Sequence, residues 1–274
     1  MTRRVRISGI VLLVCSFPFI VFLFIPASQI EGVLRRLFAA QEYTFSAGRF
    51  GKAFPLGITA RDITITDRRG VLLQVDKLEL RPVILATLAG APTVSANAAI
   101  GAGTIDLRWR WGKTGGINAD ISGLPLEQIP FFRTIAGATV KGVLRGEARL
   151  TGMPPRMNGT IKVEVRKTEL ADLKIGELPL PAVTDETIQG MLRVKDGRGR
   201  VESLTVEGNG LYARLSGEIP LSAAAPLDLM LELMPKADFM EKQKFVFLLL
   251  IKYLDSPGHY RLPVRGTLSK PQIF

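Results

Sequence analysis

Residue types that could support catalysis are scarce in this chain. It contains one histidine, His259, and one cysteine, Cys15. A zinc site needs several Cys or His ligands, and a serine hydrolase of the α/β type needs a G-x-S-x-G elbow, which the sequence lacks. His259 follows Pro257-Gly258 and is expected to be an ordinary turn residue. The sequence therefore predicts no enzyme activity, no metal site and no cofactor.

Two further patterns could be mistaken for binding sites. Residues 208–213 read G-N-G-L-Y-A and match G-x-G-x-x-A, but a phosphate site of this kind needs a helix to follow, with its N–H groups aimed at the ligand. Here a period-two strand pattern follows, so we expect a hairpin turn. The acidic residues Asp185-Glu186, and Asp172 near Glu177, lie among loop-like residues, so we expect them to be solvated.

The longest apolar stretch of the chain runs from Ile7 to Ile25 without one charge. As a helix these nineteen residues would be about 28 Å long, which matches a hydrocarbon core of about 30 Å. We predict a transmembrane helix over 7–25 after a cytoplasmic tail over 1–6. Its anchoring side chains are Ile7, Ile10, Val11, Leu12, Leu13, Phe17, Phe19, Ile20, Phe22, Leu23, Phe24 and Ile25.

The charges before this stretch predict its orientation. Arg3, Arg4 and Arg6 precede it, and basic flanks stay in the cytoplasm, so residues 26–274 should be exported. A cleaved signal peptide is an alternative, but its apolar region is shorter and ends in a small residue, whereas Ile25 is bulky. A lipoprotein site is another alternative, in which Val14 would precede Cys15.

The remaining charge is strongly positive. The net charge is +11, of which the three N-terminal arginines supply +3 and the rest of the chain +8. Such an excess favours anionic membrane surfaces or acidic partners. It is spread along the sequence and not gathered in a tract, so we do not expect nucleic-acid binding.

Residues 26–45 are predicted to form a juxtamembrane amphipathic helix and a linker. Ser28 and Glu31 fit a capping box at its start, and apolar residues then recur at helical spacing from Ile30 to Phe38. This helix could lie on the lipid surface or dock on the domain that follows.

Residues 46–274 are predicted to form a β-rich domain. From Phe54 onward apolar and polar residues alternate, and turns such as Asp67–Gly70, Asp196-Gly197 and Asn209-Gly210 separate the runs. In residues 107–111, Leu and both tryptophans fall on one face and two arginines on the other. We therefore expect a mainly β fold, an elongated, curved antiparallel sheet or sandwich with a few short helices.

One helix near the C-terminus carries a continuous apolar run, residues 245–251. The run is too short to span a bilayer. It could pack in the protein's own core, against a partner or among lipid headgroups. The candidate contact residues are Phe245, Phe247, Leu248 and Ile251.

Taken over almost its full length, the chain resembles the type II secretion system protein N family of Gram-negative bacteria. The resemblance lies in the Arg-flanked anchor, F-P-L-G-I-T-A-R-D-I-T-I followed by K-L-E-L-R-P, L-P-L-E-Q-I-P-F-F-R followed by K-G-V-L-R-G-E-A-R-L-T-G, and the closing Y-R-L-P-V-R-G-T-L-S-K-P-Q-I-F. The last segment is also similar to the closing strands of AsmA-like proteins, which carry one anchor and a periplasmic β-groove.

The first resemblance implies a non-enzymatic accessory component of the type II secretion system. It would be a single-pass inner-membrane protein with its bulk in the periplasm, where it would contact inner-membrane and periplasmic secretion proteins during export of folded substrates. The second resemblance implies a protein that binds or transports phospholipid in an apolar β-groove.

Overall fold

A computed structural model describes residues 26–40, 42–54, 56–112, 115–153, 156–172, 174–175, 178–208, 210–220, 226–267 and 270–273. The predicted anchor over 7–25 and the arginines before it lie outside the described residues. No helix within the described part of the chain is long and apolar enough to cross a membrane.

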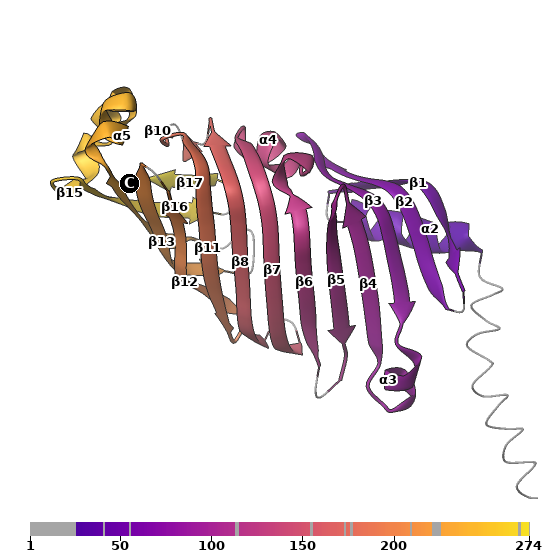
Figure 1. Ribbon diagram of the computed structural model, residues 1–274. Coiled ribbons are helices and arrows are strands. Elements are labelled where there is room, and N and C mark those ends of the chain that lie inside the picture. Colours follow the sequence, from indigo (N-terminus) through magenta and orange to yellow (C-terminus); the bar gives the residue numbers. More distant parts are fainter. Residues whose placement is uncertain are drawn as a thin grey trace, which may run out of the picture.

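One antiparallel sheet of fifteen strands dominates the structure (Figure 1). Each strand pairs with the next along the chain, except that β8 pairs with β11 and that β16 carries β14 on one side and β15 and β17 on the other. The short β9 (Lys174–Ile175) and β10 (Leu178–Pro179) form a separate pair. The strands of the main sheet are β1 (Thr44–Ala53), β2 (Gly57–Asp67), β3 (Gly70–Pro82), β4 (Thr93–Ile100), β5 (Gly103–Arg110), β6 (Gly116–Pro125), β7 (Thr139–Met153), β8 (Arg156–Ala171), β11 (Val183–Lys195), β12 (Arg198–Glu207), β13 (Leu211–Pro220), β14 (Asp228–Pro235), β15 (Leu254–Ser256), β16 (His259–Thr267) and β17 (Lys270–Ile273).

Short helices lie around this sheet. α2 (Ala27–Ala39) packs beside β1, and α3 (Ile84–Leu88) joins β3 to β4. η1 (Leu126–Gln128) and α4 (Phe131–Ala136) join β6 to β7, and α4 also contacts β3. α5 (Ala237–Lys242), α6 (Lys244–Leu249) and η2 (Ile251–Tyr253) lie between β14 and β15.

The buried apolar residues form two separate clusters, one toward each end of the sheet. The N-terminal cluster gathers residues of β1 to β6, and Leu34 and Phe38 of α2 pack against it. The C-terminal cluster gathers residues of β11 to β16 together with Phe247 and Leu250. Helices at both ends of the sheet thus supply part of each core (Figure 1).

The predicted mainly β, antiparallel fold with few helices is confirmed, in the form of one sheet and not of a sandwich. The helix expected from Ile30 to Phe38 is also confirmed. Its predicted capping box is wrong. Pro26, with φ −62°, occupies the N-cap and no side chain caps the helix, while the Glu31 carboxylate accepts a hydrogen bond from Arg35 one turn later (2.6 Å).

Two other sequence expectations need correction. β1 begins at Thr44, two residues before the β-rich domain was expected to begin. The single helix expected around 245–251 is split at Gln243 and Leu250 into α5, α6 and η2, because Gln243 leaves helical geometry with φ −112° and ψ 26°.

Candidate functional site

One face of the sheet is apolar across its whole width. Residues paired directly across neighbouring strands lie on the same face, so the strand register defines transverse rows. In one row the thirteen strands β1–β8, β11–β14 and β16 each contribute an apolar side chain or a glycine: Phe50, Ala60, Leu78, Ala98, Ile105, Ile121, Gly146, Val163, Gly190, Leu204, Leu215, Leu231 and Leu262. We call this surface the apolar face.

A second row, nearer the ends of the strands that carry α3, is equally apolar. It runs through Ile58, Leu80, Ala96, Leu107, Ala119, Ala148, Ile161, Leu192, Val201, Gly217, Leu229, Val264 and Ile273. Neither row contains a charged or hydrogen-bonding side chain from β2 to β16. The apolar face is therefore a continuous band and not a set of separate patches.

The middle of the band is not packed against a second layer. Ile105, Leu107, Ile117 and Ala119 are only half-buried, whereas Leu262 and Leu250 in the C-terminal cluster are completely buried. A sheet face of this composition is normally covered by another sheet or by helices. The half-burial of β5 and β6 shows that the described elements do not cover it there, although α2, α5 and α6 cover its ends.

A cavity of about 320 Å³ opens into the band at its N-terminal end. Its walls are apolar throughout and include Leu34 and Phe38 of α2, Phe45 of β1, and Ile63 and Ile105. The rings of Phe38 and Phe45 stack at 5.4 Å between centroids. A site with these walls excludes polar ligands and suits a hydrocarbon group.

In the orientation of Figure 1, the upper and lower ends of the sheet are closed by different elements. At the upper end, Thr134 of α4 donates a hydrogen bond from its hydroxyl to the carbonyl oxygen of Val71 in β3 (2.6 Å), so α4 bridges from β7 back to β3. Ile129, just before α4, packs against the N-terminal cluster. Within the described ranges, the lower end carries hairpin loops and α3.

The tryptophan pair lies near this lower end. Trp109 lies on the apolar face, as the alternation predicted, and stacks on Trp111 with 4.7 Å between ring centroids. The indole Nε1 of Trp109 is buried and has no hydrogen-bond acceptor within the described part of the chain. It is a polar group that a bound ligand could satisfy.

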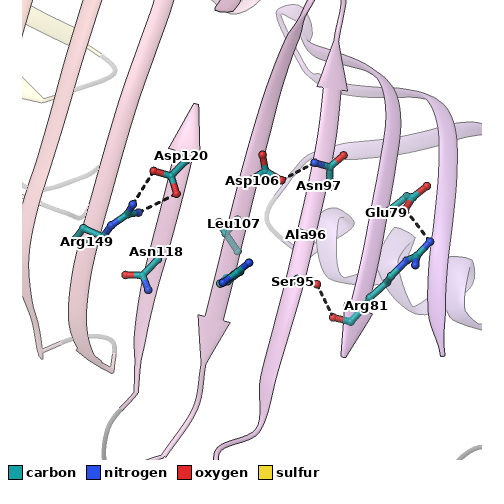
Figure 2. Close-up of a pocket in the computed structure, with 11 residues that line it drawn as sticks. Glu79, Arg81, Ser95, Ala96, Asn97, Asp106, Leu107, Asn118, Asp120 and Arg149 are labelled. Carbon is teal, nitrogen blue, oxygen red and sulfur yellow. Dashed lines mark hydrogen bonds and ion pairs between the residues drawn. The ribbon is translucent and has the colours of Figure 1, made fainter. Parts of the chain in front are cut away.

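The opposite face is polar and carries a hollow of about 620 Å³. Figure 2 shows the side chains that line it. Two ion pairs lie there, Arg149 with Asp120 (2.8 Å) and Arg81 with Glu79 (3.1 Å), and the Asn97 amide donates to Asp106 (2.6 Å). The hydrogen bond with Asp120 raises the pKa of the Arg149 guanidinium. Groups compensated in this way stabilise the sheet surface and present no acid–base pair to a substrate.

One carboxyl group lies on the apolar face of the sheet. Glu186 of β11 is 2% exposed and pairs in the sheet with Thr168, which is fully buried. Its Oε2 atom has no partner among the described residues. Burial, together with the charge of Asp185, raises its pKa, and Lys236 acts in the opposite direction. The prediction that Glu186 is a solvated loop charge is therefore wrong.

The other residues singled out from the sequence do not form a site. His259 Nδ1 lies 3.6 Å from an Asp255 carboxylate oxygen, and the described residues contain no cluster of groups able to hold a metal ion. Residues 208 and 210–213 join two paired strands, β12 and β13, so the hairpin prediction is confirmed. Asp172 is exposed, while Glu177 lies outside the described residues.

The candidate contact residues of α6 and η2 divide into two groups. Phe247 is 5% exposed and packs against Tyr260 with 5.3 Å between ring centroids. Phe245, Leu248 and Ile251 are 71%, 56% and 61% exposed. The run thus fills the protein's own core on one side and leaves an apolar surface on the other.

Comparison with known proteins gives no relative: no family model, no curated protein and no solved structure matches the chain. The apolar face, its cavity and the polar back of the sheet are the observations that bear on function.

Proposed function

We propose that this protein binds the acyl chains of a lipid along the apolar face of its sheet. The observation that carries the proposal is the pair of uninterrupted apolar rows from β2 to β16, half-buried in the middle and without a covering layer among the described residues. A row of this kind matches an extended hydrocarbon chain, which needs contact along its length and no hydrogen bonds.

The energetics favour this class of ligand. Each methylene group removed from water contributes about 0.8 kcal/mol, so ten methylene groups against the band would contribute ~8 kcal/mol before the costs of ordering the ligand. A polar ligand would lose its hydrogen bonds with water there without replacement. Phospholipid is the ligand class that we propose, in the manner of the AsmA-like proteins that the closing strands resemble.

Within this proposal the predicted helix over 7–25 anchors the chain in the inner membrane, and the described sheet lies in the periplasm. The excess of basic residues beyond the anchor supports a place beside anionic headgroups. The protein would then shield acyl chains close to the membrane from which they come.

A second candidate is an accessory role in type II secretion, through contact with other secretion proteins. The exposed side chains of Phe245, Leu248 and Ile251 favour it, because exposed apolar residues that gather in one place mark interaction sites. Deletion of the gene would test this role. Unchanged secretion of folded substrates and unchanged assembly of the secretion complex would exclude it.

Lipid extraction tests the first proposal. The full chain is purified from native membranes, extracted with organic solvent and analysed by mass spectrometry, and we expect stoichiometric phospholipid. Ile105→Glu places a charge in the middle of the apolar face, whereas Thr104→Glu places the same charge on the exposed polar face one residue away. We expect lipid loss in the first variant only.

Two results would refute lipid binding. One is wild-type protein that carries no phospholipid above the level of an unrelated membrane protein treated in the same way. The other is equal lipid content in the two variants when circular dichroism shows both to be folded. Crosslinking in the same membranes identifies protein partners, so the two candidate functions are separated in one preparation.

A further inference from the structure

The lower rim of the sheet carries exposed apolar side chains on neighbouring loops. We define the lower rim by the loops β1–β2, β3–β4, β5–β6, β7–β8 and β11–β12 (Figure 1). On the first of these loops Phe54 is 83% exposed, and on the second Leu85 and Leu88 of α3 are 82% and 65% exposed. Because β2 pairs with β3, with Ile58 opposite Leu80, these two loops are neighbours.

These apolar residues occur at the tip of a projecting loop and not on a packed face. The β3–β4 loop, residues 83–92, contains no charged side chain, and no residue of α3 is buried. An uncharged helical turn of Ile, Leu and Ala that projects into water costs solvation free energy, which burial of these side chains in hydrocarbon would recover.

Basic residues follow the rim beyond this tip. Arg110, Arg156, Lys195 and Arg198 lie at the ends of β5, β8, β11 and β12, and all four are exposed. None of them forms an ion pair with another residue of the described part of the chain. Among the described residues of these loops, Asp196 in the β11–β12 turn is the acidic one. Basic residues therefore outnumber acidic residues along the rim from β1 to β12.

The two tryptophans of the chain also lie at this rim. Trp109 ends the apolar face, and Trp111 follows β5, where its backbone N–H donates to the carbonyl oxygen of Pro92 in the α3 loop (2.9 Å). Tryptophan is enriched where hydrocarbon meets headgroups, because its ring is apolar and its N–H is polar. The rim therefore combines an aliphatic tip, an aromatic pair and a row of cations that have no ion-pair partner among the residues that the structure describes.

We propose that the lower rim docks on the surface of an anionic lipid bilayer, with Leu85 and Leu88 inserted among the acyl chains and the four basic residues at the phosphate groups. Charge complementarity selects this occupant, because an anionic lipid surface offers phosphate groups to all four cations, which lie on the separate strands β5, β8, β11 and β12. Docking would place the open end of the apolar face against the membrane, while α4 closes the opposite end. It is a separate contact from the predicted anchor, and it does not require that the face carries a lipid.

A single fluorescent probe at the tip tests the docking. Because Cys15 is the sole cysteine, Cys15→Ser followed by Leu85→Cys gives one labelling site for an environment-sensitive dye. The full chain is reconstituted into phosphatidylcholine vesicles with or without phosphatidylglycerol, so that the anchor holds it on both. We expect a blue-shifted emission that lipids with quencher groups on their acyl chains extinguish, and a larger effect with phosphatidylglycerol.

The matched control carries the dye at Phe245→Cys, because Phe245 is also apolar and largely exposed (71%, against 82% for Leu85) but lies at the other end of the sheet. Its emission should not depend on phosphatidylglycerol. Neutralising rim charges with Arg110→Gln and Arg156→Gln should lower the ratio of docked to undocked rim about fivefold per arginine. Arg145→Gln on the polar face should leave the ratio unchanged.

Three outcomes would overturn the proposal. The first is an unquenched dye at residue 85, and the second is the same quenching at residue 245. The third is a dye at residue 85 that becomes buried without vesicles as the protein concentration rises, because a second copy of the chain and not a bilayer would then cover the tip. Leu85, Phe245 and the three substituted arginines are exposed, so these variants are expected to fold.

Discussion

Glu186 shows how a single side chain can make the stability of this sheet depend on pH. Its carboxyl group is buried beside Thr168 and Gly208, and a Cβ atom at residue 208 would collide with it. The raised pKa means that the fold prefers the protonated form, because burial penalises the carboxylate. Stability from the protonated group is therefore complete below the usual pKa near 4.5 and is lost as the pH rises through the higher value in the fold.

Replacing Glu186 by glutamine should remove this dependence. The melting temperature of Glu186→Gln, measured by circular dichroism, should rise relative to that of the wild type as the pH increases from 4 to 8. Glu207→Gln, at the exposed end of the neighbouring strand, serves as the control and should run parallel to the wild type. Parallel curves for Glu186→Gln as well would contradict the assignment, because they would show that the pKa of this carboxyl is the same in the folded and unfolded chain.

Leu262 provides a measure of packing in the C-terminal cluster. It is 0% exposed and faces Leu231 across the β14–β16 pair. We expect Leu262→Ala to lower the free energy of unfolding by about 2–5 kcal/mol, because it leaves a cavity where close packing existed. Arg261→Ala, on the polar face beside it, should change the same quantity by less than ~0.5 kcal/mol in a urea titration. A smaller loss at Leu262 than at Arg261 would contradict this assignment of the core.

Residue types alone predicted the side on which Trp109 lies but not the burial of Glu186. Alternation places Trp109 and Arg110 on opposite faces whatever the rest of the sheet does. Glu186, by contrast, follows Asp185, whose positive φ of 57° interrupts the strand pattern, so its side chain enters the apolar region through an irregularity that composition does not reveal. Gly208, which lies beside Glu186 in the fold and leaves room for its carboxyl group, was the signal of this burial that the sequence contained.

At the scale of elements, β1 was missed for a related reason. In the first half of β1 the odd-numbered residues Phe45 and Ala47 point to the apolar face. Near Gly48 the pattern shifts by one residue, so that the even-numbered Phe50 points to this face in the second half. The same change occurs opposite it at Asp62, which has φ 54°. A change of phase in mid-strand breaks a period-two pattern, and the two glycines of β1 weaken it further.

Docking of α2 rests on few contacts and can be tested directly. None of its residues is fully buried, and Phe38 stacks on Phe45 while Leu37 beside it is 60% exposed. We expect Phe38→Ala to speed amide hydrogen exchange within α2 several-fold and to increase binding of a hydrophobic dye, since the cavity beneath it would open. Leu37→Ala should do neither, and equal effects of the two substitutions would show that α2 is not held by its inner face.

For the whole molecule, separate clusters at the two ends predict uneven stability. No apolar side chain of β5 is fully buried, and regions with few buried contacts open most readily. In hydrogen exchange with mass spectrometry, β5 should exchange faster than β14 in lipid-free protein. Added phospholipid should slow exchange in β5 more than in β14. Uniform protection along the sheet would contradict this division.

The architecture as a whole was more predictable than its use. Alternation and turn residues are local properties, so they predicted hairpins such as β12–β13 and the antiparallel class. Whether a second layer covers the apolar strands depends on residues far apart in the chain, and a sheet with one bare face has the same alternating pattern as half of a sandwich. The uncovered face, the cavity and the basic rim therefore came from the structure alone.

The serial order of the strands also bears on how the protein is made. Most strands pair with their neighbours in sequence, so the average contact joins residues a short distance apart, and such low contact order favours fast folding for an all-β chain. Each strand can add to the sheet as the chain emerges from a narrow channel, without waiting for a distant partner. A growing edge of this kind would expose one unpaired strand at each stage, and this open edge is the part of the partly made sheet most exposed to aggregation.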